Sequence, residues 1–255
     1  MFFSRVQIVE NIQNNSQLGR LLSDQTYGSH RLLRELFTDS TKFLFREEQS
    51  REQLSTRHNR PVFYVLSSAR PKDSNPLFKC ETKPFNPTLS EGVQLEFKLR
   101  ANPLIAIKDG GKKNSKKHDV IMHGQRVWLL SECERRGLSV EGSKKELISR
   151  LKAHKDHASR GMKFDASLEA VRTESGQQWL KSRAEKRGFN VLALQTTGYR
   201  WNALPEKGRS AGYSSLDYEG ILQVTDADLF NAVLKEGLGA SRSFGCGLMM
   251  TMPAR

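Results

Sequence analysis

A phenol, an imidazole and a guanidinium share one edge of a short predicted helix in residues 26–37, TYGSHRLLRELF. At about 100° per residue, Tyr27, His30 and Arg34 fall within a strip roughly 60° wide. The apolar side chains fall on the neighbouring stripe, which we expect to be buried: Leu32, Leu33, Leu36 and Phe37. Because imidazole ordinarily titrates near pH 6.5, His30 can take or give a proton at neutral pH. The group therefore predicts proton-transfer chemistry beside a positive charge.

RNA is a substrate for which such a small group suffices. Its own 2′-hydroxyl is the nucleophile, so cleavage needs only proton transfer, in-line alignment and stabilisation of charge. The competing interpretation is that His30 lies at the edge of the core and merely packs there. The other histidines lie in polar loops or in an insertion: His58, His118, His123, His154 and His157. No carboxylates with metal-ligand spacing accompany them, so we expect no metal and no cofactor.

A glycine-rich segment, EGLGASRSFGCGLMM at residues 236–250, precedes the last predicted strand. Its glycine spacing fits neither the Walker loop nor the dinucleotide fingerprint. One interpretation is a plain turn or bulge, in which glycine adopts positive φ. The other is a loop whose backbone a ligand approaches closely, with Ser241, Arg242 and Ser243 facing that ligand.

The charge of the chain predicts a polyanionic partner. There are 41 Lys and Arg against 28 Asp and Glu, a formal net charge of +13 at pH 7. Such a balance attracts phosphates. An anionic membrane surface is the competing polyanion, but no apolar run approaches the roughly 20 residues that span a bilayer. The start lacks signal-peptide features and the three cysteines are scattered. We therefore expect a soluble, cytoplasmic protein without a membrane partner.

Hydrophobic patterning predicts an α+β fold of tandem ferredoxin-like (RRM-like) βαββαβ domains, residues 1–100 and 101–255, with a small helical insertion in the second. For the first domain we expect strands at 2–10, 42–47, 61–69 and 93–101, a helix within 16–37 and an irregular, proline-containing segment at 75–92, where a second helix is degraded. For the second domain we expect a first strand after Asn102 and a helix that ends at Gly188. Two strands follow, at 189–197 and 216–226, separated by a basic turn region at 198–215. A helix at 226–237 and a last strand at 248–253 complete the domain.

The insertion, residues 121–165, reads as helix, glycine-containing turn and helix with a small core of its own. It resembles a SAP module, a short element that binds double-stranded DNA. The matching positions are Leu130, Cys133, Gly137, Leu138, Gly142, Lys144, Leu147, Arg150 and Leu151. The resemblance implies DNA-phosphate contacts by Lys144, Lys145, Arg150 and Lys152. The alternative is an insertion that braces another protein subunit.

Three segments together resemble one family: YGSH at 27–30, FKLRANP at 97–103 and GLGASRSFGCGLM at 237–249. This family is the CasE-like CRISPR RNA-processing endoribonucleases of type I-E Cascade complexes, and the resemblance covers roughly residues 1–118 and 170–255. It implies a repeat stem-loop substrate and metal-independent cleavage by 2′-hydroxyl attack, which leaves a 2′,3′-cyclic phosphate and a 5′-hydroxyl. It maps the catalytic residues onto His30 and Tyr27, and implies that the product hairpin stays bound within Cascade, beside the backbone and tail-proximal subunits, in antiviral defence.

The family's tail loop usually carries a Lys-Ser pair, whereas this chain has Arg242 and Ser243. We therefore expect Arg242 to contact RNA without acting as the catalytic cation. An A-form stem is recognised mainly by shape and backbone. The expected RNA contacts are Arg31, Arg34, Lys112, Lys113, Lys116, Lys117, Arg200, Lys207, Arg209, Ser241, Arg242 and Ser243. Two alternatives stay open: a non-catalytic RNA-binding subunit of Cascade, and a DNA-binding protein that acts through the insertion.

Overall fold

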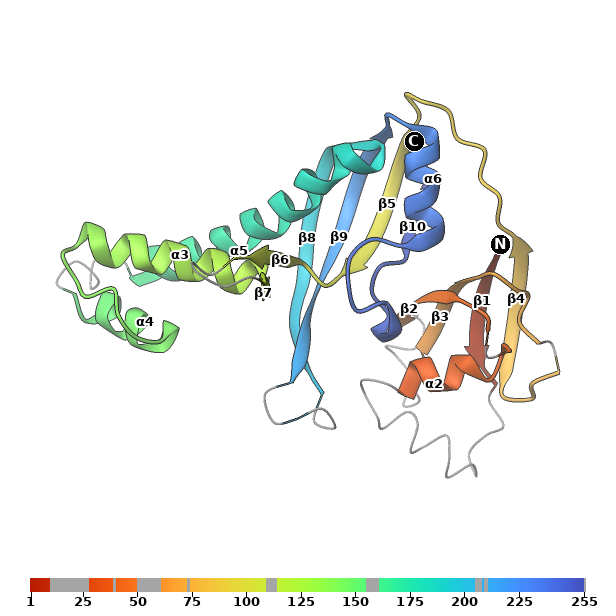
Figure 1. Cartoon of the computed structure of the whole chain (residues 1–255), viewed down its shortest axis with the longest axis horizontal. Helices are drawn as coiled ribbons and strands as arrows, with labels where there is room; N and C mark the ends of the chain where they lie inside the picture. The colour runs from red at the N-terminus through yellow and green to blue at the C-terminus, as the bar shows by residue number, and fades with distance from the viewer. Residues whose placement is uncertain are drawn as a thin grey trace. The chain divides into compact units, whose positions relative to one another are not determined.

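The structure, a computed structural model shown in Figure 1, contains two four-stranded antiparallel sheets. It describes residues 1–9, 28–38, 40–49, 61–72, 74–108, 114–154, 161–204, 208 and 211–254. One compact unit combines Met1–Asn102 with Ala184–Arg255, and the other is Pro103–Arg183. The described helices include none with the length and apolar character needed to cross a bilayer.

The first sheet has the strand order of a ferredoxin-like domain. Its elements are β1 Phe2–Ile8, α2 Gly28–Arg34, β2 Phe43–Gln49, β3 Pro61–Ser67 and β4 Phe78–Pro84, and its strand order is β2-β3-β1-β4. Read from the β4 edge, the strands lie in the order β4-β1-β3-β2, which is the 4-1-3-2 order of the ferredoxin-like fold. Between β3 and β4, the described residues 68–72 and 74–77 contain no helix, as the degraded second helix predicts.

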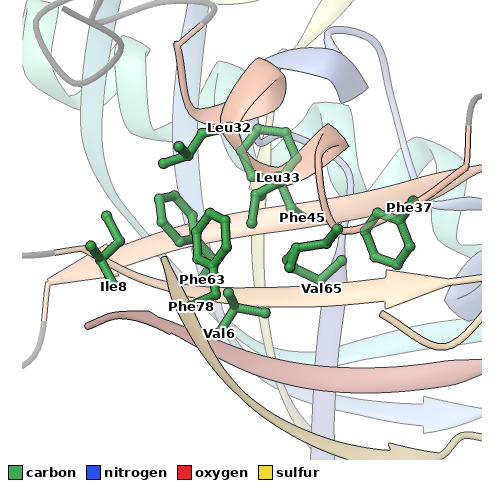
Figure 2. Close-up of a cluster of buried hydrophobic side chains, with 10 residues drawn as sticks. Val6, Ile8, Leu32, Leu33, Phe37, Phe45, Phe63, Val65 and Phe78 are labelled. Atoms are coloured by element: carbon green, nitrogen blue, oxygen red, sulfur yellow. The ribbon is translucent and has the colours of Figure 1, made fainter. Parts of the chain in front are cut away.

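The apolar stripe predicted in residues 26–37 forms the core of this domain (Figure 2). Leu32 and Leu33 of α2 are fully buried, and the turn that follows buries Leu36 and Phe37. They pack on alternate residues of the sheet: Val6, Ile8, Phe45, Phe63, Val65 and Phe78. Since this core fixes one face of α2, the edge that carries His30 and Arg34 is turned to the margin of the core.

The expected irregular segment at 75–92 contains a strand, so that prediction was wrong in part. β4 pairs with β1 over its whole length, from Ile8 opposite Phe78 to Phe2 opposite Pro84. β4 is an edge strand, and Pro84 ends it, where a missing N–H removes no bond to a further neighbour. The prolines therefore mark the ends of this strand.

The second sheet also has the ferredoxin-like order. Its elements are β5 Gln94–Ala101, β8 Phe189–Ala203, β9 Gly212–Val224, α6 Ala227–Glu236 and β10 Met249–Pro253, and its strand order is β10-β5-β9-β8. The expected helix and strand limits at its C-terminal end are confirmed. Asp226 caps α6 by accepting from the Leu229 amide at 2.9 Å, and Gly237 ends it.

The strand at 93–101 was expected to close the first sheet, but it is the first strand of the second. β5 lies between β9 and β10 and buries alternate residues, Leu95, Phe97, Leu99 and Ala101. The segment expected in that place, β6 Leu104–Ile107, pairs with β7 Lys116–Asp119 in a separate two-stranded sheet. β6 is short and partly exposed, and so lacks the buried face that a central strand requires.

The basic segment at 198–215 is largely a hairpin rather than a turn. β8 continues to Ala203 and β9 begins at Gly212, so polar residues extend the ladder beyond the part that the core covers. The register shifts between Thr197 and Arg200, where Gly198 has a φ of 64°. A bulge of this kind twists the strand pair and redirects its far end.

The unit Pro103–Arg183 contains the predicted helix-turn-helix and is larger than the expected insertion. Its helices are α3 Val120–Arg135, α4 Lys144–Ala153 and most of α5 Gly161–Ala184, which the 3-10 turn η3 Glu185–Arg187 and Gly188 terminate. The core is confirmed as its own: Leu129, Cys133, Leu147, Leu151 and Phe164 are buried together. Ser143 and Glu146 form a capping box that starts α4.

Candidate active site

His30 lies at the margin of the first domain's core and is half-buried. Its imidazole stacks on Phe43, with ring centroids 5.0 Å apart and planes at 19°, and is tilted against Phe45 at 6.2 Å. Arg34 covers the same Phe43 ring at 4.7 Å and donates to the Thr41 carbonyl at 2.7 Å. The helix thus holds an imidazole and a guanidinium against one aromatic ring.

The environment of His30 favours its neutral form. Burial lowers the pKa of His30 below the ordinary 6.5, and the positive charge of Arg34 lowers it further. At neutral pH the imidazole is therefore mostly uncharged and able to accept a proton.

The glycine-rich loop reaches the first domain. Its 3-10 turn, η5 Arg242–Phe244, lies against both α2 and β2. A Cβ on Gly245 would stand 3.3 Å from the Phe45 ring, the same ring that contacts His30, and the φ of Gly245 is 77°. Leu248 packs between Leu44 and Leu66. The absence of a side chain at Gly245 therefore brings the loop close to the aromatic support of His30.

A strained residue starts the 3-10 turn. Ser241 has a φ of 60°, a left-handed conformation unusual for a residue other than glycine. The buried Asn102 holds it by donating to the Ser241 hydroxyl at 2.8 Å. Arg242 and Ser243, which follow, are exposed, and the Arg242 guanidinium donates to the carbonyls of Gly237 and Gly239. The loop presents a positive charge beside the helix that carries His30.

Not all of the predicted site residues can be placed in this cluster. Tyr27, Lys112, Lys113, Lys207 and Arg209 lie outside the described residues. Arg31 and Arg200 are exposed, on α2 and on the β8–β9 hairpin. Lys116 and Lys117 are exposed on β7 of the unit Pro103–Arg183.

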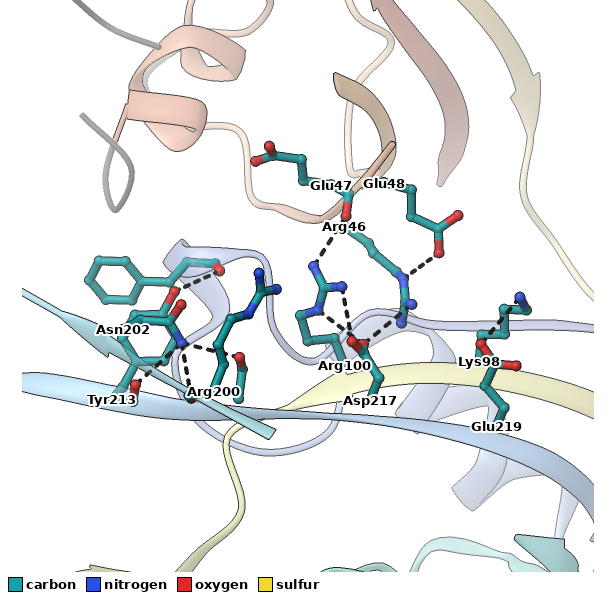
Figure 3. Close-up of polar contacts among 12 residues, drawn as sticks. Arg46, Glu47, Glu48, Lys98, Arg100, Arg200, Asn202, Tyr213, Asp217 and Glu219 are labelled. Carbon is teal, nitrogen blue, oxygen red and sulfur yellow. Dashed lines mark hydrogen bonds and ion pairs between the residues drawn. The ribbon is translucent and has the colours of Figure 1, made fainter. Parts of the chain in front are cut away.

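A polar network that no sequence pattern indicated joins the two sheets (Figure 3). Asp217 of β9 accepts from Arg100 of β5 at 3.0 Å through both of its oxygens, and lies 3.3 Å from the guanidinium of Arg46 on β2. Although burial acts in the opposite direction, the hydrogen bond and charge of Asp217 raise the pKa of Arg100. These residues come from strands far apart in the chain, so no local pattern could have grouped them.

The network continues to α2. Arg100 Nη1 donates to the Glu47 carbonyl at 3.2 Å, and the Glu47 carboxylate accepts from the Ser29 hydroxyl at 2.8 Å.

Burial raises the pKa of Cys246, also in the glycine-rich loop, to about 12, so its thiol is not ionised at neutral pH. His30 is therefore the described group of this cluster best suited to proton transfer.

The four cations expected to contact DNA differ in their surroundings. Lys144 is half-buried and bonds the Gln125 side chain, and burial lowers its pKa. Arg150 donates to the carbonyls of Ser139 and Glu141, which closes the turn. Lys152 lies 3.6 Å from Asp165, and Lys145 is exposed. Among the described residues, no three His, Cys, Asp or Glu side chains are grouped to hold a metal ion.

The chain as a whole resembles known proteins of one family. Residues 1–253 match the family model described as CRISPR associated protein. The CRISPR-associated endoribonuclease Cse3 of Thermus thermophilus is 25% identical over 172 residues, 67% of this chain and 61% of that protein. The Cascade subunit CasE of Escherichia coli is 25% identical over 173 residues, 68% of this chain and 65% of that protein. The matches thus span less than two thirds of each relative's length.

Solved structures share the fold. Thermus thermophilus Cse3 bound to an RNA representing a pre-cleavage complex has a TM-score of 0.61 and 19% identity, with 99% of each chain covered. Cas6e from Escherichia coli has a TM-score of 0.55 and 22% identity over the whole of both chains. These similarities agree with the two ferredoxin-like sheets, and the predicted fold class is confirmed.

Proposed function

The chain belongs to the family of CRISPR-associated proteins, among its CasE-like members, and on that premise we propose that it is an endoribonuclease. Its substrate is CRISPR precursor RNA, which it cuts at the repeat stem-loop. The observation that carries the proposal is a half-buried, mostly neutral His30 on α2, next to the glycine-rich loop. The relatives named for endoribonuclease activity and for RNA binding support it.

In the proposed reaction the neutral His30 takes the proton of the 2′-hydroxyl. The 2′-oxygen then attacks the neighbouring phosphorus in line as the bond to the 5′-oxygen breaks, and the leaving oxygen gains a proton. The products are a 2′,3′-cyclic phosphate and a 5′-hydroxyl. No metal ion is needed, because the nucleophile belongs to the substrate and the proton acceptor is an imidazole. Tyr27, three residues before His30 in the sequence, is the proposed second catalytic group.

Charge near the site supports binding of the phosphate backbone. Arg242 on the loop and Arg31 on α2 are exposed cations on elements that lie against each other. Arg200 adds a cation on the β8–β9 hairpin. Such contacts fix the register of an RNA stem without reading its sequence. We propose that they keep the product hairpin bound, so that the protein remains with the mature RNA as a Cascade subunit.

The chemistry can be tested with a labelled repeat hairpin in EDTA. Cleavage in the chelator, a 2′,3′-cyclic phosphate end and no cleavage of a hairpin that lacks the 2′-hydroxyl at the mapped position are expected. Strong inhibition by EDTA, or cleavage of the 2′-deoxy hairpin, would contradict 2′-hydroxyl attack without a metal. Tight binding without any cleavage of cognate repeats would favour the alternative, a non-catalytic RNA-binding subunit.

A second proposed function concerns the unit Pro103–Arg183, which has its own core and exposes Lys145 and Lys152 on α4. We propose that these lysines bind duplex DNA through phosphates. Reversing both charges to Glu in the full chain should weaken duplex binding and spare hairpin cleavage. Lys186→Glu, an exposed lysine in the other unit, serves as the control. Unchanged duplex binding in this double variant would favour a bracing role for the insertion.

A further inference from the structure

We infer that Glu47 is a positioning residue that ties the helix carrying His30 to the second sheet. Its side chain binds Ser29, directly before His30, and its backbone carbonyl binds Arg100, which Asp217 holds. The inference rests on the proposed catalytic role of His30. It assigns a function to a set of polar residues that touch neither the imidazole nor, in the proposed mechanism, the reacting atoms.

The first link is a short hydrogen bond at the start of α2. Ser29 Oγ donates to Glu47 Oε2 at 2.8 Å, and an acceptor with negative charge makes such a bond stronger than one between neutral groups. Tertiary contacts, more than helix propensity, hold a helix in place within a folded domain.

The second link fixes Glu47 itself. Arg100 Nη1 donates to the Glu47 carbonyl at 3.2 Å, while Arg100 Nε and Nη2 each lie 3.0 Å from an oxygen of Asp217. Arg100 and Asp217 are directly opposite in the β5–β9 ladder. Arg46, the residue before Glu47 and almost fully buried, reaches the same carboxylate at 3.3 Å. Two guanidiniums therefore join β2 to one acid of the second sheet (Figure 3).

The Ser29–Glu47–Arg100–Asp217 connection matters because the cleavage rate depends on where the imidazole of His30 lies. The glycine-rich loop connects α6 to β10 of the second sheet, whereas His30 belongs to the first domain. Packing of the imidazole on Phe43 and Phe45 is non-directional, but hydrogen bonds set both distance and angle. A displacement of about 1 Å can reduce a rate roughly 100-fold. The Ser29–Glu47–Arg100–Asp217 connection therefore holds the proton acceptor in register with groups on the second sheet.

The test is the single-turnover cleavage rate at saturating hairpin, measured together with hairpin Kd and thermal stability. Ser29→Ala should slow cleavage about 10-fold, with Kd within about 2-fold of wild type and no matching loss of stability. Ser29→Thr keeps the hydroxyl and should restore most of the rate. Glu47→Ala should slow cleavage as much as Ser29→Ala does. Glu47→Gln keeps an acceptor oxygen, so its cleavage rate should fall less.

A matched control lies on the same pair of strands. Lys98 and Glu219 form an exposed ion pair at 3.2 Å, opposite each other in the β5–β9 ladder and two residues from Arg100 and Asp217. Glu219→Gln should leave the rate unchanged. Asp217→Asn should slow cleavage and also lower stability, because it removes the charge that the buried Arg46 and the half-buried Arg100 share. When Ser29→Ala is combined with Asp217→Asn, the cleavage rate should fall little further, since both substitutions break the same connection.

The outcomes separate this inference from the proposed function. If His30→Ala cleaves at the wild-type rate, the catalytic assignment itself is wrong. If His30→Ala is inactive but Ser29→Ala cleaves like wild type, the assignment stands and the positioning role is overturned. A Ser29→Ala variant whose rate, Kd and stability fall together would also overturn it, since that pattern indicates general destabilisation.

Discussion

His30 lies where burial and a positive neighbour both disfavour the imidazolium. The nearby loop adds a further cation, Arg242, and the Cys246 thiol remains protonated because of its burial. These conditions suit an imidazole that accepts a proton at neutral pH. They also connect the proposed catalysis to a measurable property of one residue.

The cleavage rate should therefore depend on the protonation of His30. Because the neutral form is active and the pKa lies below 6.5, the rate should be constant near neutral pH and fall only as acidity protonates the imidazole. Arg34→Gln removes a charge that lowers this pKa. The acid limb of the pH–rate profile, where the rate falls as His30 is protonated, should therefore move to higher pH. The measurement is the single-turnover rate from about pH 5 to about pH 8.

Two variants of the same helix control this experiment. Arg34→Lys keeps the positive charge and should leave the limb near its wild-type position. Arg31→Gln removes an exposed charge that is not among the causes of the shift at His30. A limb that moves equally in all three variants would show that the titrating group is not His30.

At the scale of the elements, helical periodicity predicted the buried face of the helix that carries His30, whereas strand assignment was less secure. The stripe of Leu32, Leu33 and Leu36 could be predicted because a buried helix face repeats locally. β4 was missed because prolines at a strand end resemble those of a loop. β5 was assigned to the wrong sheet because alternation reveals a buried face but not which partner strands cover it.

The contact of the glycine-rich loop with β2 gives a stability prediction. Gly245→Ala should lower the free energy of unfolding by about 2 kcal/mol, because a positive φ strains alanine and the new Cβ would press on Phe45. Gly92→Ala has a similar φ, 83°, and no neighbour within 4 Å, so it measures the backbone cost alone. The free energy of unfolding is measured by urea denaturation. If Gly245→Ala and Gly92→Ala lower it equally, the contact with Phe45 contributes nothing.

The core of the insertion gives a second prediction at this scale. Leu147→Ala should destabilise the unit Pro103–Arg183 by about 2–5 kcal/mol, because Leu147 is fully buried there. Proteolysis within this unit should become faster, while hairpin cleavage persists. Val127→Ala, on the same unit but half exposed, should change protease sensitivity little. Loss of hairpin cleavage in Leu147→Ala alone would show that the insertion supports the catalytic half.

For the whole molecule, the net charge of +13 at pH 7 predicts attraction to polyanions such as the proposed RNA substrate. This prediction needs only composition, because charge is additive along the chain. The polar network between the sheets was not predictable, since Arg46, Arg100 and Asp217 meet only once both domains are folded. The sequence thus predicted the buried face of the helix better than the contacts that position it.

Hairpin affinity should fall steeply as salt rises, on the order of 10³-fold between about 50 and 200 mM for six or more phosphate contacts. Arg242→Ala should weaken binding of all hairpins similarly and reduce the salt slope by about one phosphate. Lys235→Ala removes an exposed cation outside the proposed surface and should leave the slope unchanged. An unchanged slope in Arg242→Ala would remove that residue from the RNA surface.

The central claim, that His30 performs the proton transfer of RNA cleavage, is tested most directly by one pair of measurements on His30→Ala. Single-turnover cleavage of the cognate repeat hairpin and its Kd are determined under identical conditions. The account predicts a rate lower by about 10²- to 10⁴-fold, the usual contribution of a general base, with Kd nearly unchanged. Cleavage at the wild-type rate, with the same products, would contradict it.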